Sequence, residues 1–161
     1  MLNVRKRLEA AGLVLPQPLQ VPAGIELPFP WVSVRGERVF ISGHGPQNPD
    51  GSISGPFGKV GADVTVEEAK DLARKTALAI LASLDSALGD LDRITAWCRV
   101  FGMVNSAPGF NQQPTVINGF TEIIALAFDG NVARHTRSAV GMAGLPFDIA
   151  VEIEGEVLIA S

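Results

Sequence analysis

The stretch RSAVGMAGLPFDIAVEIEGEV, residues 137–157, predicts two β-strands near the end of the chain, at about Ser138–Gly144 and Ala150–Ile159. In the second strand apolar residues alternate with glutamates. Because successive side chains of a strand point to opposite faces, one face is apolar and the other is acidic. We expect helices to pack on the apolar face. The apolar face consists of Val151, Ile153, Val157 and Ile159, and the acidic face consists of Glu152, Glu154 and Glu156.

Arg137 stands at the head of the first strand, and small residues share its face at positions 139, 141 and 143. Arginine keeps its charge in proteins and is rarely buried without a partner. Its partner is either the anionic group of a ligand or a glutamate of the next strand, Glu152 or Glu154. The acidic face suits open solvent in a monomer. For the whole chain we favour a subunit interface, since small residues beside charges suit a packed, partly wet contact.

The longest predicted helix has both of its ends marked in the sequence. Thr65 and Glu68 form a capping box at its start, and Gly89 supplies the stop. Between them, apolar residues recur every three or four positions, which predicts one buried face. Two further helices are expected over residues 2–11, ending at Gly12, and after Pro114.

The remaining strands complete one layered domain. Residues 31–43 predict two short strands around a turn, and residues 92–104 predict another. We therefore expect an α/β (α+β) fold, in which helices pack on one face of a mixed β-sheet. Residues 1–29 form an N-terminal helix and a proline-rich extension, and residues 30–161 form the main domain.

Composition excludes several classes of function. The 161 residues carry a net charge of −4, and their basic residues are scattered, which argues against nucleic acid as the main partner. The most apolar segment is too short to span a bilayer, so no membrane association is expected. Cys98 is the single cysteine, and no Cys/His cluster has metal-ligand spacing. No signal peptide is recognisable, and we expect a cytoplasmic protein.

Several ordered motifs together resemble the Rid family, the reactive intermediate deaminases also catalogued as YjgF-like or L-PSP "endoribonuclease" proteins. The ending quoted above is similar to the family's Arg-Ser, short strand, Leu-Pro and alternating Glu strand. Upstream, PW (30–31), ISGHGP (41–46) and VINGFTEI (116–123) match further family segments. GKVGADVTVEEA (58–69) and GMVNSAPGF (102–110) resemble a longer branch with an N-terminal extension.

The resemblance implies a chorismate-mutase-like fold assembled as a homotrimer, with a central β-barrel and three clefts between neighbouring subunits. It also implies a cofactor-free reaction, in which an enamine or imine is hydrolysed to a keto acid and ammonia. The partner would then be a small carboxylate-bearing metabolite. Arg137 matches the family's carboxylate-binding arginine, and a planar guanidinium meets a carboxylate with two parallel hydrogen bonds. Glu152 matches the family's water-positioning glutamate.

Four other positions match the family cleft. Ser42 and Asn118 stand where they could bind a ligand or satisfy backbone groups. Trp31 replaces a common tyrosine, which keeps an aromatic wall but loses the hydroxyl. Ala139 replaces a common cysteine. Cys98 lies on a different strand, where we expect a small buried apolar side chain. His44 replaces a glutamine; it is expected either at the surface or as a proton carrier near neutral pH.

Two functions from different classes follow from these residues. The first is a hydrolytic deaminase of small enamine or imine carboxylates, in which Arg137 and Glu152 act together. The second is a trimer that binds a small carboxylate metabolite without turning it over, as the replacements Trp31 and Ala139 indicate. An endoribonuclease has less support, because the chain is acidic and has no His–His or His–Lys pair at a recognisable spacing.

Overall fold

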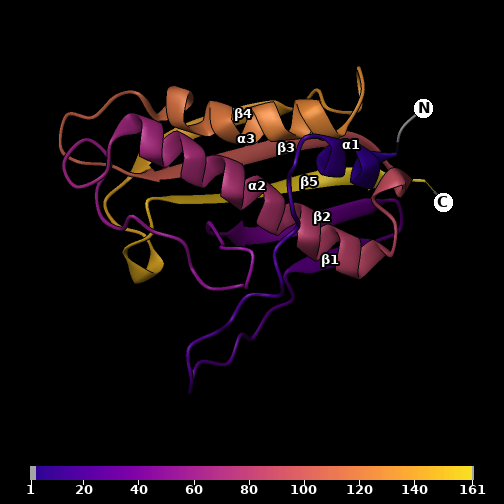
Figure 1. The fold of residues 1–161 in the computed structure, drawn as a ribbon, viewed down its shortest axis with the longest axis horizontal. Coiled ribbons are helices and arrows are strands. Elements are labelled where there is room, and N and C mark those ends of the chain that lie inside the picture. Colours follow the sequence, from indigo (N-terminus) through magenta and orange to yellow (C-terminus); the bar gives the residue numbers. More distant parts are fainter. Residues whose placement is uncertain (1–2, 161) are drawn as a thin grey trace.

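The computed structural model describes residues 3–160, which form one five-stranded mixed sheet covered by helices on one side (Figure 1). The strand order is β1-β2-β5-β3-β4. β3 and β4 are parallel, and the other neighbouring pairs are antiparallel. The mixed sheet predicted from the sequence is therefore confirmed. The strands are β1 (Val32–Arg35), β2 (Arg38–His44), β3 (Ile94–Asn105), β4 (Thr136–Met142) and β5 (Val151–Ile159).

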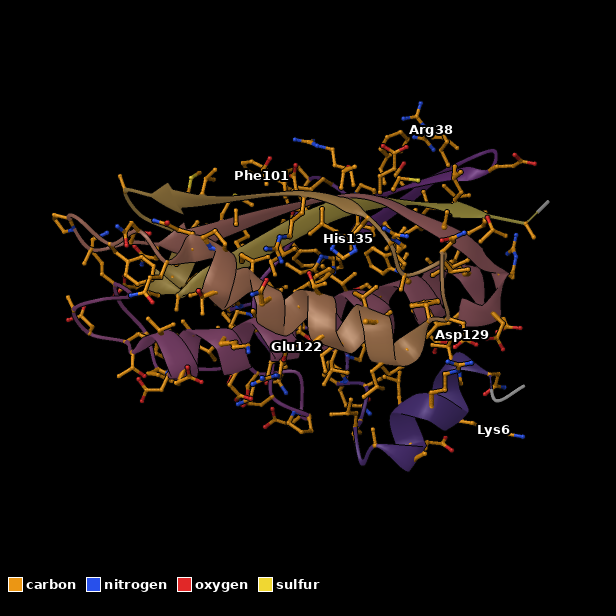
Figure 2. All side chains as sticks on the ribbon, turned by 90° about the horizontal axis from the view of Figure 1, so that it is seen from above. Lys6, Arg38, Phe101, Glu122, Asp129 and His135 are labelled. Carbon is orange, nitrogen blue, oxygen red and sulfur yellow. The ribbon has the colours of Figure 1, made fainter. Side chains whose placement is uncertain are left out.

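Three α-helices lie on the same side of the sheet, as Figure 2 shows from above. The capping box of α2 is present, because Thr65 and Glu68 exchange hydrogen bonds between side chain and backbone. None of the helices within residues 3–160 is long and apolar enough to cross a membrane. The helices are α1 (Val4–Ala10), α2 (Val66–Leu88) and α3 (Gln113–Ala127), and short 3₁₀ turns occur at Leu91–Arg93 and Pro146–Asp148.

The core lies between the helices and the apolar face of the sheet. All four residues predicted for the apolar face of β5 are buried in it. Trp97 of β3 packs edge-on against Phe120 of α3. α1 joins the same core through Val4 and Leu8. The proline-rich segment after α1 extends away from the body of the molecule before the chain enters β1 (Figure 1).

Within residues 3–160, no helix lies over the other face of the sheet. Figure 2 shows Arg38 and Phe101 on this side, away from the helices. The Arg38 guanidinium lies over the Phe40 ring at 5.2 Å, and Arg99 lies over Phe101 at 5.7 Å. The uncovered face thus combines aromatic rings with arginines and the glutamates of β5, and one chain leaves it open to solvent.

Candidate functional site

Arg137 is fixed on β4 by groups of the helix that packs against it. Its Nη1 donates to Asn118 Oδ1 and Thr121 Oγ1, each at 3.0 Å. Its Nη2 reaches the Pro114 carbonyl oxygen at 3.5 Å. These partners all belong to α3, so the guanidinium lies on the helix side of the sheet. In the parallel pairing with β3, Arg137 lies opposite Val100, which is buried in the core.

The guanidinium borders an open hollow of about 530 Å³ and meets no carboxylate among residues 3–160. The alternative of an ion pair with Glu152 or Glu154 is therefore not realised within one chain. Partial burial lowers the pKa of Arg137, but an arginine remains charged near neutral pH. A cation held by neutral groups beside a hollow is suited to bind an anion. The polar members of the lining are Asn118, Thr121, Arg134, His135 and Arg137.

Glu152 lies on the opposite face of the sheet. It pairs with Met103 of β3, and its carboxylate lies against Gly43 of β2, where a Cβ atom would overlap it. Burial raises the pKa of Glu152 above its usual 4.5, and the charge of Glu154 on the same face raises it further. A half-buried carboxyl with a raised pKa is suited to exchange protons with a substrate.

Trp31 and Ser42 accompany Glu152 rather than Arg137. The Ser42 amide donates to the Trp31 carbonyl oxygen at 3.0 Å, and Ser42 Oγ donates to the Pro30 carbonyl oxygen at 2.8 Å. Trp31 and Glu152 line the same cavity of about 180 Å³. Ser42 therefore satisfies a backbone group in this structure, and Trp31 supplies an aromatic wall beside the carboxyl.

The six predicted site residues thus fall into two groups. Arg137 and Asn118 are in contact, and Ala139 lies two positions along β4 from Arg137. Trp31, Ser42 and Glu152 gather around β2 and β5. Two strand spacings, about 10 Å, separate β5 from β4 in the sheet, and Arg137 and Glu152 point to opposite faces of it. One chain does not bring Arg137 and Glu152 together.

Both expectations for His44 are wrong. Its side chain is only 2% exposed and lies between β2 and α2. Nδ1 lies 2.6 Å from the Ser42 carbonyl oxygen and so carries the proton, while Nε2 accepts from Ser83 Oγ at 2.9 Å. Burial lowers the pKa of His44 to about 4, so it is neutral at physiological pH. Cys98, expected to be buried, is partly exposed on β3.

Sequence reasoning missed one side chain that positions Arg137. Thr121 accepts from the guanidinium and lies 3.2 Å from His135 Nε2. The signal was available, because Asn118 and Thr121 are three residues apart and residues at that spacing share one face of a helix.

No group of three or more histidine, cysteine, aspartate or glutamate side chains between residues 3 and 160 is placed to hold a metal ion.

Comparison with known proteins gives consistent matches across most of the chain. Residues 5–152 match the family described as "YjgF/chorismate mutase-like, putative endoribonuclease". The protein TCP17 of Trypanosoma cruzi is 40% identical over 122 residues, which are 76% of this chain and 75% of that protein.

Two solved structures superimpose closely on this one. A protein of unknown function from Agrobacterium tumefaciens is 37% identical with a TM-score of 0.85, over 97% of this chain and 91% of that one. A protein from Shewanella oneidensis, described as a "putative endoribonuclease", is 26% identical with a TM-score of 0.86, over 98% of this chain and 100% of that one.

Proposed function

Because the chain belongs to the YjgF/chorismate mutase-like family, also known as the Rid family, we propose that it is a cofactor-free deaminase. It hydrolyses a small enamine or imine that carries a carboxylate and releases a keto acid and ammonia. The observation that carries this proposal is the Arg137 guanidinium, which neutral groups of α3 hold beside an open hollow.

Arg137 binds the substrate carboxylate. Asn118 and Thr121 both accept from Nη1 and so restrain the guanidinium, leaving its remaining N–H groups to meet an anion. A bidentate contact of this kind fixes the orientation of the substrate as well as its position. The substrate replaces no internal ion pair, so binding does not first have to break one.

Glu152 handles the protons of the reaction. An enamine first takes up a proton at carbon and loses one from nitrogen, which gives the imine. Glu152 then accepts a proton from water as the water oxygen bonds to the imine carbon, and the proton is returned to nitrogen. The hydroxyl group of this intermediate then gives up its proton, nitrogen takes up a proton, and the carbon–nitrogen bond breaks, so that ammonia leaves and the carbonyl group of the keto acid remains. No electron donor or acceptor is needed.

The separation of the two groups supports a site that is shared between chains. Arg137 of one chain and Glu152 of its neighbour meet across an interface, and the assembly is the homotrimer that the sequence resemblance implies. The uncovered sheet face supports this arrangement, because its exposed Phe40 and half-buried Phe101 would be covered when sheets of neighbouring chains face one another.

The test is hydrolysis of an imine made in the assay, for example by an amino-acid oxidase acting on alanine, followed as keto acid released above the spontaneous rate. Arg137→Ala lowers kcat/KM by about 100-fold or more, since a charge-assisted bidentate contact is lost. Arg74→Ala, which removes a surface arginine of α2, serves as the matched control and keeps full activity.

The role of Glu152 has its own readout, the pH profile. Activity falls as the pH drops, because the Glu152 carboxylate becomes protonated. The raised pKa of Glu152 places this acidic limb of the kcat/KM profile above pH 4.5. Glu152→Gln lowers the rate by about 10²- to 10⁴-fold and removes this limb. A wild-type protein with no activity on any such imine would contradict the proposal.

A second candidate, a non-catalytic trimer that binds small carboxylates, is favoured by Ala139 and Trp31, which replace the family's common cysteine and tyrosine. Calorimetry separates the two candidates. Binding of pyruvate without turnover of its imine supports the binding protein.

The endoribonuclease label of relatives finds less support, because His44 is buried and neutral and His135 is held by Thr121.

A further inference from the structure

The cavity beside Glu152 has a shape and lining that the proposed function does not use. Its volume is about 180 Å³, and Glu152 is the only charged side chain that lines it among the described residues. For comparison, an apolar protein cavity of about 150 Å³ holds one benzene molecule. The space is therefore sized for a single six-membered ring. Its apolar walls include Leu27, Phe29, Trp31, Ile53, Phe147 and Ile149.

Much of this wall comes from the proline-rich extension. Leu27 and Phe29 precede β1, and Phe29 packs edge-on against Trp31 with ring centroids 5.8 Å apart. Trp31 in turn lies 4.9 Å from the His44 ring, centroid to centroid. The extension is thus anchored through a stack of rings to a buried side chain of β2. This contact fixes one side of the cavity.

Another part of the wall is held by a strained turn. Phe147 and Asp148 have φ values of 56° and 57°, a region that residues other than glycine rarely adopt. Gly58 N donates to the Asp148 carbonyl oxygen at 2.8 Å, and fully buried Asn105 donates through Nδ2 to Asp148 Oδ1 at 3.1 Å. These bonds maintain a conformation that places the Phe147 side chain at the cavity.

We propose that this cavity is the specificity pocket of the enzyme and receives an aromatic or large branched side chain of the substrate. The inference rests on the proposed function, since it assigns the cavity to the substrate on which Glu152 acts. The preferred substrate is then the imine of an aromatic 2-amino acid. An apolar pocket discriminates by the area that each substrate buries, and one methylene group is worth roughly 10- to 200-fold in kcat/KM.

The test compares two imines made by the same oxidase, 2-imino-3-phenylpropanoate from phenylalanine and 2-iminopropanoate from alanine. The phenyl substrate is favoured by about tenfold or more in kcat/KM. Phe29→Ala removes this preference, measured as the ratio of the two kcat/KM values. Phe57→Ala is the matched control, because Phe29 and Phe57 are each 47% exposed and Phe57 does not line the cavity. Equal rates on both imines would overturn the pocket while leaving the deaminase in place.

Calorimetry decides the matter when neither imine is turned over. Phenylpyruvate then binds about tenfold or more tightly than pyruvate, and Phe29→Ala abolishes the difference. That result supports the pocket even though the deaminase has failed. Equal affinity for the two keto acids, or a preference that survives Phe29→Ala, would overturn the pocket.

Discussion

The His44 imidazole couples the stability of the fold to pH. It is neutral and buried between β2 and α2, with both ring nitrogens hydrogen-bonded. Its pKa is about 4 in the folded chain and about 6.5 when the chain is unfolded. As the pH falls below 6.5, His44 binds a proton in the unfolded chain but stays unprotonated in the folded chain. Stability is therefore lost as the pH falls from 6.5 to about 4.

We predict that His44→Gln reduces this pH dependence. A shift of about 2.5 pKa units corresponds to about 3 kcal/mol of unfolding free energy between pH 7 and pH 4. Urea unfolding of the wild type and the variant at the two pH values measures this difference. The other titrating groups contribute equally to both proteins, so their effect cancels in the comparison. The same loss of stability in the wild type and the variant would contradict the account of His44.

At the level of elements, the contact between α2 and α3 depends on a glycine. Gly119 is buried in α3, and a Cβ atom there would overlap the Lys70 carbonyl oxygen of α2. The missing side chain lets the two helices approach closely. Two effects oppose each other at this position. Alanine is favoured over glycine by about 1 kcal/mol inside a helix, but its side chain would overlap α2.

We predict that packing prevails and that Gly119→Ala destabilises the protein by roughly 1–3 kcal/mol. The clash is with backbone, so no side-chain rotation relieves it. Chemical denaturation measures the change. Ser86→Ala, at an exposed position in the last turn of α2, is the control and stays within about 0.5 kcal/mol of the wild type. Gly119→Ala at or above wild-type stability would show that the helices can separate at little cost.

The same elements show what the sequence could predict. The capping box and glycine stop of α2 are local signals, and both of its ends were placed correctly. The alternation in β5 predicted its apolar and acidic faces correctly, because successive side chains of a strand point to opposite faces. β4 begins at Thr136 rather than near Ser138, so Arg137 lies inside the strand.

The placement of Arg137 relative to Glu152 could not be predicted in this way. The two-residue alternation within a strand shows which of its side chains share a face. It does not show how the faces of β4 and β5 are related, because that depends on how each strand pairs with β3. In the observed register Arg137 pairs with Val100, and Val100 pairs with Gly155, so Arg137 shares the face of Gly155 and not that of Glu152. The pairing of β3 with β4 then turns Arg137 toward the helices. The resemblance assigns roles to both residues, and their separation is visible only in three dimensions.

On the scale of the whole molecule, the proposed site is complete only when chains meet. Each chain carries one group around Arg137 at the β4 side and another around Glu152 near β2 and β5. A homotrimer of 17.0 kDa chains has a mass of 51 kDa, which light scattering measures directly. If neighbouring chains supply the two groups, every site draws Arg137 and Glu152 from different polypeptides.

We therefore predict that two inactive variants restore activity when they are assembled together. Chains carrying Arg137→Ala and chains carrying Glu152→Gln are co-expressed or refolded as a mixture, and imine hydrolysis is measured. With equal amounts and random assembly, about one quarter of the sites in such a symmetric oligomer combine an intact arginine with an intact glutamate. Each variant refolded alone is the control and stays inactive. A mixture no more active than its separate components would show that both residues act from one chain, or that one of them is not needed.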